Sequence, residues 1–349
     1  MPGKKSSPKY IKDNTTIPIA QVLTYGIHDE IIQGAKTPFI IMDLIPGQKL
    51  HTKTFLCATK AQRQRLYTDL IDILSQLRKL EFPAGGSLMP NPEDDKCSPI
   101  LGPFLSITAN EFERSSGRSL RQEVFTSLGR FVDYHHSILT ETYQLPVENL
   151  SYRDAKTELF ALDCLSKEIS KCIGSMPTSP SFVLAHPDLR FGNIFVDDDF
   201  HILGIIDWEF TSTIPLQLFT PPPWVTGHDP DTLRVMRGLV RGPFRDEIFA
   251  EFRDVLQNKR ETCSISENLM GVYCSSLFRI LFGPLADRDA EIAKFFDHPD
   301  NVSLVKQVEL QIEKSKRYTQ YLEDRGLLVE DVQSQQILKP PFDFFRLPL

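Results

Sequence analysis

The residues best suited to chemistry are polar side chains around a predicted β-hairpin. Asn193 directly precedes one apolar run, Ile194 to Val196, and Asp207 directly follows the next, Ile202 to Ile206. Because an antiparallel hairpin brings the start of its first strand and the end of its second to the same edge, these two residues should present metal-binding oxygens together. Asp188 stands five residues before Asn193, on the loop entering that edge, where a carboxylate could accept a proton from a substrate hydroxyl.

The elements that must position these residues are predicted from periodicity and chain breakers. Two β-type runs, Ile19 to Tyr25 and Phe39 to Leu44, are expected to pair antiparallel. An apolar stripe predicts a helix over Gln62 to Leu80, and Phe82 to Pro103, rich in Gly, Pro and Asn, is predicted as an irregular loop. Further helices are expected at Leu120 to Leu139, Asp154 to Ile173, Asp231 to Gln257, Ser266 to Phe282 and Ser303 to Leu322. We therefore predict an α+β fold, with a pair of strands, a helical body and a central hairpin.

Composition argues against several classes of protein. The net charge is −7 and no dense basic run occurs, so nucleic acid is not expected as a partner. No apolar stretch reaches the roughly 18 residues needed to cross a bilayer, and the chain begins with polar sequence where a signal peptide would be apolar. We therefore expect no membrane partner and a cytoplasmic location. The six cysteines show no C-x-x-C spacing, which indicates reduced thiols.

The catalytic motif resembles a known family. The segment Ala185-His186-Pro187-Asp188-Leu189-Arg190-Phe191-Gly192-Asn193, followed by the hairpin and Asp207-Trp208-Glu209, is similar to the aminoglycoside phosphotransferase and choline kinase superfamily, a relative of the protein kinases. Any one of these residues alone is a common turn residue, so the joint pattern carries the resemblance. It implies a protein-kinase-like fold with a mostly helical C-terminal lobe, a central catalytic hairpin and a reduced N-terminal β lobe.

The resemblance also assigns roles within the motif. It implies that Asp188 is the catalytic base, that Asn193 and Asp207 hold Mg²⁺, and that His186 props the loop through hydrogen bonds. Arg190 is added on chemical grounds, because a guanidinium two residues after Asp188 could neutralise charge on the γ-phosphate of ATP. The family usually has Gly where this chain has Pro187, whose fixed φ should stiffen the loop.

A second match lies at Thr37 to Gly47, which resembles the hinge between the two lobes of the family. The resemblance implies that the Asp43 carbonyl and the Ile45 amide bond adenine, with Met42 behind the purine. By itself this segment also fits a plain buried strand and turn. Two further segments, Leu77 to Leu88 and Pro215 to Trp224, resemble the fungal-type branch of the superfamily.

These matches divide the chain into three parts. Residues 1–45 correspond to a remnant of the ATP-binding lobe and the hinge, 46–330 to the helical catalytic and substrate lobe, and 331–349 to a C-terminal tail. Residues 1–18 are too few for three strands and a helix, so no candidate exists for the family's phosphate-covering loop or ATP-binding lysine. We therefore expect weak ATP binding and self-association through exposed N-terminal strands.

Three functions fit this pattern. The first is an ATP- and Mg²⁺-dependent phosphotransferase acting on an alcohol group of a small molecule, whose true start lies upstream of Met1; without the loop and the lysine it would be impaired. The second is a catalytically inactive kinase-like module that binds a ligand or a protein. The third, a protein kinase, is disfavoured because Trp-Glu follows Asp207 where protein kinases have Phe-Gly. The acceptor substrate carries no diagnostic motif.

Overall fold

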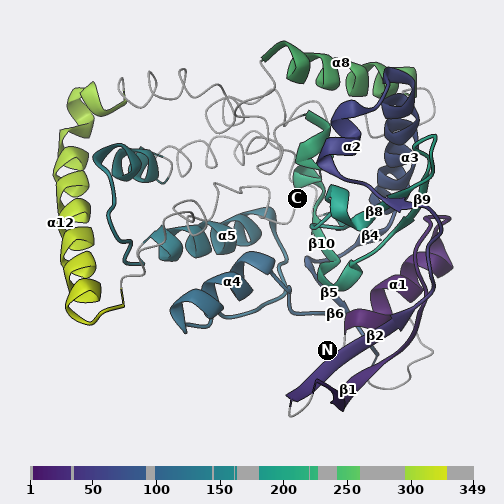
Figure 1. Ribbon diagram of the computed structural model, residues 1–349, viewed down its shortest axis with the longest axis horizontal. Helices are drawn as coiled ribbons and strands as arrows, with labels where there is room; N and C mark the ends of the chain where they lie inside the picture. The colour runs from purple at the N-terminus through teal and green to yellow at the C-terminus, as the bar shows by residue number, and fades with distance from the viewer. Residues whose placement is uncertain are drawn as a thin grey trace.

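The fold is described from a computed structural model, in which residues 3–32, 35–91, 99–143, 145–160, 162, 181–219, 221–226, 242–259 and 295–327 are described. Helices and antiparallel strands both contribute to these residues, so the expected α+β class is confirmed (Figure 1). The expected segments Ser266 to Phe282 and 331–349, and parts of the helices expected from Asp154 and Asp231, lie outside the described residues.

A three-stranded sheet carries the predicted catalytic hairpin. Its order is β3 (Gln48–Lys49), β8 (Ile194–Val196), β9 (Ile202–Ile205), and all pairs are antiparallel. On the far side of β9, the Ile205 amide donates to the Pro18 carbonyl at 2.9 Å. Segments from the N-terminus and from just after residue 45 therefore flank the hairpin, whose two strands match the prediction closely.

The segment Phe82 to Pro103 was expected to be an irregular loop. It contributes strands to a five-stranded antiparallel sheet. Its order is β4 (Glu81–Phe82), β7 (Phe182–Ala185), β10 (Ser212–Pro215), β5 (Gly86–Met89), β6 (Ile100–Gly102). The loop prediction was wrong because Gly86 was read as a breaker. A Cβ there would collide with the Gly102 carbonyl oxygen, so the glycine allows close pairing of β5 with β6.

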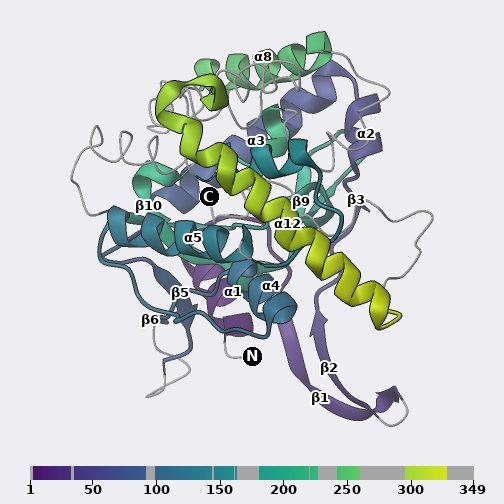
Figure 2. The ribbon, with the colours of Figure 1, turned by 90° about the vertical axis from the view of Figure 1, so that its left-hand side faces the viewer.

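The N-terminal segment forms a helix and a long hairpin. Helix α1 (Gly3–Asn14) precedes β1 (Val22–Ile32) and β2 (Ala35–Met42), which pair only with each other in the described part of the chain. The expected antiparallel pairing is confirmed, with Val22 opposite Met42. Both strands are longer than the predicted runs and continue towards the tip, where Ile32 faces Ala35. The hairpin projects from the body in two views (Figures 1 and 2).

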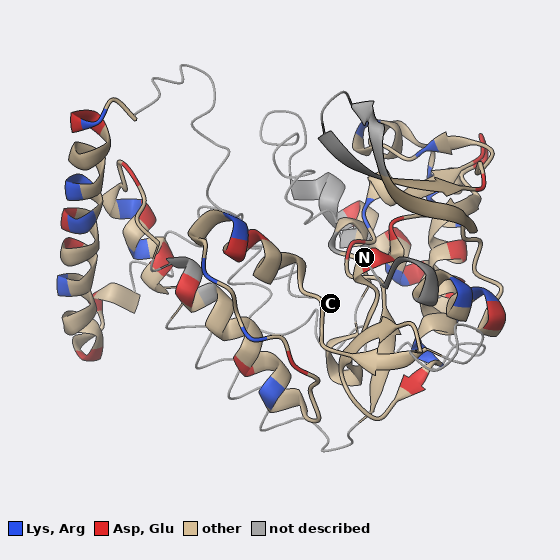
Figure 3. Cartoon of the chain, turned by 90° about the horizontal axis from the view of Figure 1, so that it is seen from below, with Lys and Arg blue, Asp and Glu red and all other residues tan. Residues whose placement is uncertain are grey.

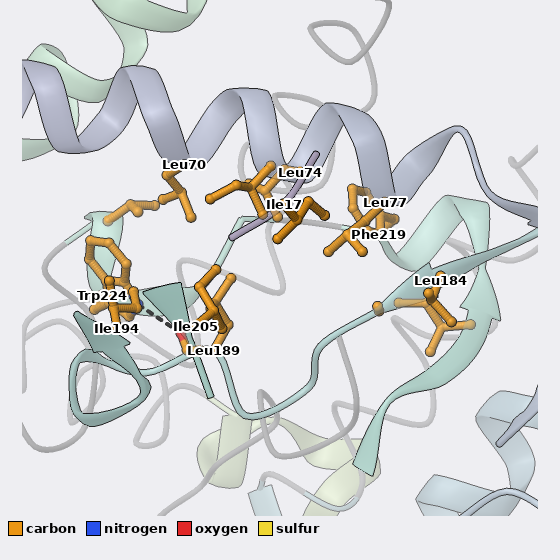
Figure 4. Packing of buried hydrophobic residues seen from close by; sticks show 14 of the residues in the cluster. Ile17, Leu70, Leu74, Leu77, Leu184, Leu189, Ile194, Ile205, Phe219 and Trp224 are labelled. Carbon is orange, nitrogen blue, oxygen red and sulfur yellow. Dashed lines mark hydrogen bonds between the residues drawn. The ribbon is translucent and has the colours of Figure 1, made fainter. Parts of the chain in front are cut away.

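Helix α3 (Lys60–Arg78) packs against the three-stranded and the five-stranded sheet, through β9 and β7. It begins at a capping box, in which the Thr59 hydroxyl accepts from the Gln62 amide and Gln62 Oε1 accepts from the Thr59 amide. Its apolar face, seen in Figure 4 as Leu70, Leu74 and Leu77, packs over Ile17 and the strands beneath. The helix predicted at Gln62 to Leu80 is thus confirmed.

A buried ion pair joins α3 to α8 (Gly242–Asn258). The Arg63 guanidinium donates to both carboxylate oxygens of Glu251, at 2.7 and 2.8 Å, and to the Ala58 carbonyl at 2.6 Å. The two charged side chains are only 6% and 2% exposed. Helix α2 (Thr52–Cys57) precedes this junction and buries Phe55.

Helix α5 (Leu128–Tyr143) begins later than the predicted Leu120. The chain before it crosses to the five-stranded sheet, where Phe125 exchanges two backbone hydrogen bonds with Gly85, so that part of the prediction was wrong. Helix α4 (Ile107–Ser116) lies beside α5. An aromatic cluster on one face of α5 encloses His135, which is 2% exposed; its other members are Phe104, Phe125, Phe131 and Tyr134.

Helix α12 (Val302–Asp324) confirms the prediction at Ser303 to Leu322 and lies away from the sheets (Figures 1 and 3). Its inner face carries Ser315 and Thr319, whose hydroxyls accept from the backbone amides of Leu150 and Asn149. Acidic and basic residues are interspersed along the helix (Figure 3). A helical segment at 152–160 packs with it.

Short 3-10 turns complete the described structure: η1 (Phe191–Asn193), η2 (Trp208–Phe210), η3 (Leu216–Leu218), η4 (Pro223–Thr226) and η5 (Pro299–Asn301). No helix among the described residues is long and apolar enough to cross a membrane.

Candidate active site

His186 stands at the end of the fully buried strand β7 and joins the catalytic loop to the chain before Asp207. Its Nε2 lies 3.0 Å from the Ile206 carbonyl, and its ring packs 4.5 Å from that of Trp208. Burial lowers the pKa of His186, although the Ile206 carbonyl and the nearby carboxylates of Asp188 and Asp207 act in the opposite direction. The neutral imidazole therefore donates through Nε2 to Ile206.

Asp188 and Asn193 form the centre of the loop. The Asn193 side-chain amide donates to the Asp188 carbonyl at 2.8 Å and to its carboxylate Oδ2 at 3.0 Å. Two further backbone bonds, from Arg190 to Asp188 and from Asn193 to Arg190, close the turn between them. Because the amide nitrogen is committed to Asp188, the amide oxygen of the buried Asn193 is the atom left to face a ligand.

Arg190 reaches the other oxygen of the same carboxylate. Its Nε lies 3.2 Å from Asp188 Oδ1, and the two side chains are 58% and 24% exposed. At this exposure the ion pair adds little stability. It does hold a positive charge beside the carboxylate, on the open side of the loop.

Asp207, two residues beyond the end of β9, takes a left-handed backbone conformation, with φ 68° and ψ 45°. Asp tolerates this region better than most residues. The amide of Ile206 donates to the Asn193 carbonyl at 3.0 Å, so the residue before Asp207 is bonded to Asn193 itself. The structure thus brings Asp188, Asn193 and Asp207 to one edge of the hairpin, with Asp207 exposed.

The sequence did not anticipate the role of Trp224 in this loop. Its indole Nε1 donates to the Leu189 carbonyl at 2.8 Å, within the catalytic segment (Figure 4). Its ring packs 4.7 Å from Phe191 and 5.8 Å from Phe55. The sequence offered one signal for this contact: Trp224 follows three prolines, and the aromatic Phe191 lies inside the predicted motif. Sequence alone does not show which backbone group the indole of Trp224 contacts.

The predicted hinge residues lie between the N-terminal hairpin and the catalytic sheet. Asp43 is fixed by its amide, which donates to the Gln21 carbonyl at 2.9 Å, and by its carboxylate, which accepts from the Gln21 amide at 3.3 Å. Ile45 sits against Gly204 of β9, where a Cβ would collide with its side chain. Met42 ends β2 and is 40% exposed. The hinge segment is therefore tied to the sheet that bears Asn193 and Asp207.

The donors for a cation are few. In the described part of the chain, no three His, Cys, Asp or Glu side chains gather into a group that could hold a metal by themselves. The edge of the hairpin offers one amide oxygen and one exposed carboxylate, both of them hard oxygen ligands.

Comparison with known proteins places the chain in a family of phosphotransferases. Residues 11–217, which include the predicted hinge, the predicted catalytic loop and the hairpin, match the phosphotransferase enzyme family. The match covers more than half of the chain, and the chain belongs to that family. The kinase-like fold expected from the sequence is confirmed at this level.

Individual relatives are distant. The chain is 27% identical over 231 residues to the clavilactone A biosynthesis cluster protein Y of Ampulloclitocybe clavipes; the alignment covers 63% of this chain and 52% of that protein. The chain thus spans about half the length of this relative.

Solved structures resemble the chain more loosely. One is a putative aminoglycoside phosphotransferase from Ralstonia eutropha, with 11% identity, a TM-score of 0.39, and 90% of this chain and 83% of that one covered. Another is the GDP complex of aminoglycoside 2'-phosphotransferase-IIIa, with 15% identity, a TM-score of 0.38, and 88% and 81% covered.

Proposed function

We propose that this protein transfers the γ-phosphate of ATP to a hydroxyl group of a small molecule. One observation carries the proposal: a single hydrogen-bonded unit joins Asp188 to Asn193 and Asn193 to the residue before Asp207. Family membership supports phosphoryl transfer as the reaction class. That ATP is the phosphate donor and an alcohol is the acceptor is proposed in addition.

In this mechanism Asp188 is the proton acceptor. Its carboxylate is partly exposed, at 24%, and held by Asn193 on one oxygen and by Arg190 on the other. As the acceptor hydroxyl loses its proton to Asp188, its oxygen forms a bond to the γ-phosphorus and the bond to the departing ADP oxygen breaks. Holding the carboxylate in place before the substrate arrives lowers the entropic cost of this step.

Arg190 and the two oxygen ligands surround the charge that moves. Arg190 lies on the open side of the loop, where its guanidinium can contact the transferred phosphoryl group. The Asn193 amide and the Asp207 carboxylate fit Mg²⁺, which usually takes one or two protein oxygens and completes its shell with phosphates and water. When bound, that ion would neutralise phosphate charge.

In the proposed mechanism, neither His186 nor the hinge touches the reacting atoms. His186 holds Ile206, and through it the start of the Asp207 turn, without carrying charge. We assign the adenine contacts to the Asp43 carbonyl and the Ile45 amide, with Met42 behind the base. The bond from Asp43 to Gln21 and the seat of Ile45 on Gly204 would keep this segment in register with the catalytic sheet.

The test is turnover with the purified chain. Mg-ATP is incubated with a panel of small-molecule alcohols, and ADP release and phosphorylated product are followed by chromatography and ³¹P spectroscopy. The proposal expects ADP formation that depends on one acceptor class. If the chain binds Mg-ATP but forms no ADP with any acceptor, the alternative of an inactive kinase-like binding module takes its place.

A further inference from the structure

Helix α3 does more than cover the catalytic sheet, because one of its polar faces contacts the turn of the hairpin. Gln62 Nε2 donates to the Asp198 carbonyl at 3.0 Å, and Arg65 donates to the carbonyl and carboxylate of Asp199 at 3.2 and 2.7 Å. Asp69 comes four residues later, one turn further along the same face. The turn is the end of the hairpin opposite to Asn193 and Asp207.

Asp69 accepts a hydrogen bond from the first residue of β9. Its Oδ2 accepts from the Ile202 amide at 2.9 Å and lies 3.1 Å from His201 Nδ1. Ile202 is the first residue of β9, and the ladder with β8 has a register shift at this point. A carboxylate on a rigid helix therefore holds the backbone where the strand pairing is irregular.

The turn itself leaves little freedom for β9 to slide. Asp197 Oδ1 accepts from the amides of Asp199 and His201, at 3.0 and 2.9 Å. Phe200 has a φ of 69°, unusual for a bulky residue, and its ring is buried in the main core. Together with Asp69 these contacts fix the turn from both sides.

The exposure of the Asp69 and His201 side chains favours a geometric role for Asp69 over a stabilising one. The Asp69 and His201 side chains are 27% and 52% exposed, so the contact between them contributes little to overall stability. Asp207 lies only five positions after Ile202, about 17 Å of extended chain. A shift of β9 at one end therefore moves Asp207 at the other.

We propose that Asp69 is a positioning residue: by holding the start of β9 through Ile202 and His201, it sets where Asp207 lies relative to Asn193. The consequence for phosphoryl transfer rests on the proposed function, whereas the effect on β9 does not.

The first test measures β9 directly. Hydrogen exchange of peptides covering 202–207 is compared in the wild type, Asp69→Ala and Asp69→Asn. The alanine variant should exchange about tenfold faster or more there, as expected for the loss of a hydrogen bond to a charged group. The asparagine variant keeps an acceptor for the Ile202 amide, so it should recover most of the protection.

Asp72→Ala is the matched control. Asp72 lies on the same helix but pairs with Lys259 of the chain after α8, at 2.5 Å. Because Asp72 is 54% exposed, its loss should change stability little and leave exchange at 202–207 unchanged. Equal exchange in Asp69→Ala and the wild type, or equal acceleration in Asp72→Ala, overturns the proposal.

The second test measures the consequence at Asp207. The Mg²⁺ concentration that half-saturates ATP binding should rise about tenfold in Asp69→Ala, while ATP binding without Mg²⁺ stays unchanged. Parallel losses with and without Mg²⁺ would mean a general loosening and contradict the proposal. If the wild type binds no Mg-ATP at all, the proposed function fails, and the exchange result alone decides whether Asp69 positions β9.

Discussion

The side-chain amide of Asn193 donates hydrogen bonds to both the backbone carbonyl and the carboxylate of Asp188, at 2.8 and 3.0 Å. One side chain therefore fixes the loop that carries the proposed base and orients the base itself. The same residue accepts a backbone bond from Ile206. Asn193 thus couples the two halves of the site, and the first two predictions below depend on this coupling.

Replacing Asp188 with Asn should abolish phosphoryl transfer and leave the fold intact. The amide has nearly the same shape, but it cannot accept the proton, and a general base contributes about 10² to 10⁴ in rate. Turnover and thermal melting are measured together. Asp198→Asn, in the hairpin turn, is the control and should keep full activity. Wild-type turnover by Asp188→Asn would remove this residue from the mechanism.

Replacing Asp207 with Ala should weaken Mg²⁺-dependent nucleotide binding more than Asn193→Ala does. A carboxylate brings a full negative charge to a hard cation, whereas an amide brings a dipole. Calorimetric titration with Mg-ATP gives the ranking. Asp207→Asn, which also tolerates the left-handed backbone, separates loss of charge from backbone strain. A reversed order would count against the assignment.

Stability should fall on acidification through His135. Burial in the aromatic cluster lowers its pKa to about 3, so the unfolded chain, near 6.5, binds the proton more readily than the folded one. The stabilisation is complete above about pH 6.5 and is lost towards pH 3, at roughly 1.4 kcal/mol per pH unit. Urea unfolding between pH 7 and 4 measures this slope.

The matched variant for that measurement is His135→Phe, which keeps an aromatic ring among Phe104, Phe131 and Tyr134. Its free energy of unfolding should depend less steeply on pH than that of the wild type. Identical slopes for the two proteins would show that another group, such as the buried His186, dominates the acid response.

Breaking the ion pair between α3 and α8 should be costly. Glu251→Ala leaves the buried Arg63 guanidinium without its bidentate partner, which typically costs about 3 to 5 kcal/mol. The double variant Arg63→Met, Glu251→Leu should recover much of this loss, because it buries no charge. Chemical denaturation tests both. A single-variant cost below about 1 kcal/mol would contradict the expectation for a buried pair.

The N-terminal hairpin should make the chain self-associate. Both outer edges of the two-stranded sheet β1 and β2 are unpaired among the described residues, and the apolar side chains of Leu23, Ile27 and Ile41 are 56%, 70% and 50% exposed. Exposed apolar strands recruit further strands. Light scattering should show concentration-dependent dimers or larger species, reduced in Ile27→Lys. A monodisperse wild-type monomer at high concentration would rule this out.

The parts of the site that the sequence predicted are those set by local geometry. Asn193 and Asp207 flank two short runs of one hairpin, so their convergence follows from antiparallel pairing alone. The five-stranded sheet could not be predicted in this way. Gly86 lies in a segment rich in turn residues, and its pairing partner on β10 is 127 residues away.

The supports of the site were missed for a similar reason. The bond from Trp224 to the Leu189 carbonyl and the contact of Asp69 with Ile202 both join residues far apart in the sequence. Each depends on where a helix or loop comes to lie after the core has formed. Periodicity identifies α3 as a helix with a buried face, but it does not show what the polar face touches.

The order of strands in the five-stranded sheet has a consequence for synthesis on the ribosome. Strand β5 leaves the ribosome long before β10, because 127 residues separate Gly86 from Thr213. At about 5 to 20 residues per second, this interval lasts roughly 6 to 25 s. During that time the nascent chain holds β5 and β6 without the strand that completes their sheet. Chaperone binding should therefore concentrate on this segment, and slowing translation between β6 and β7 should lower the yield of folded protein.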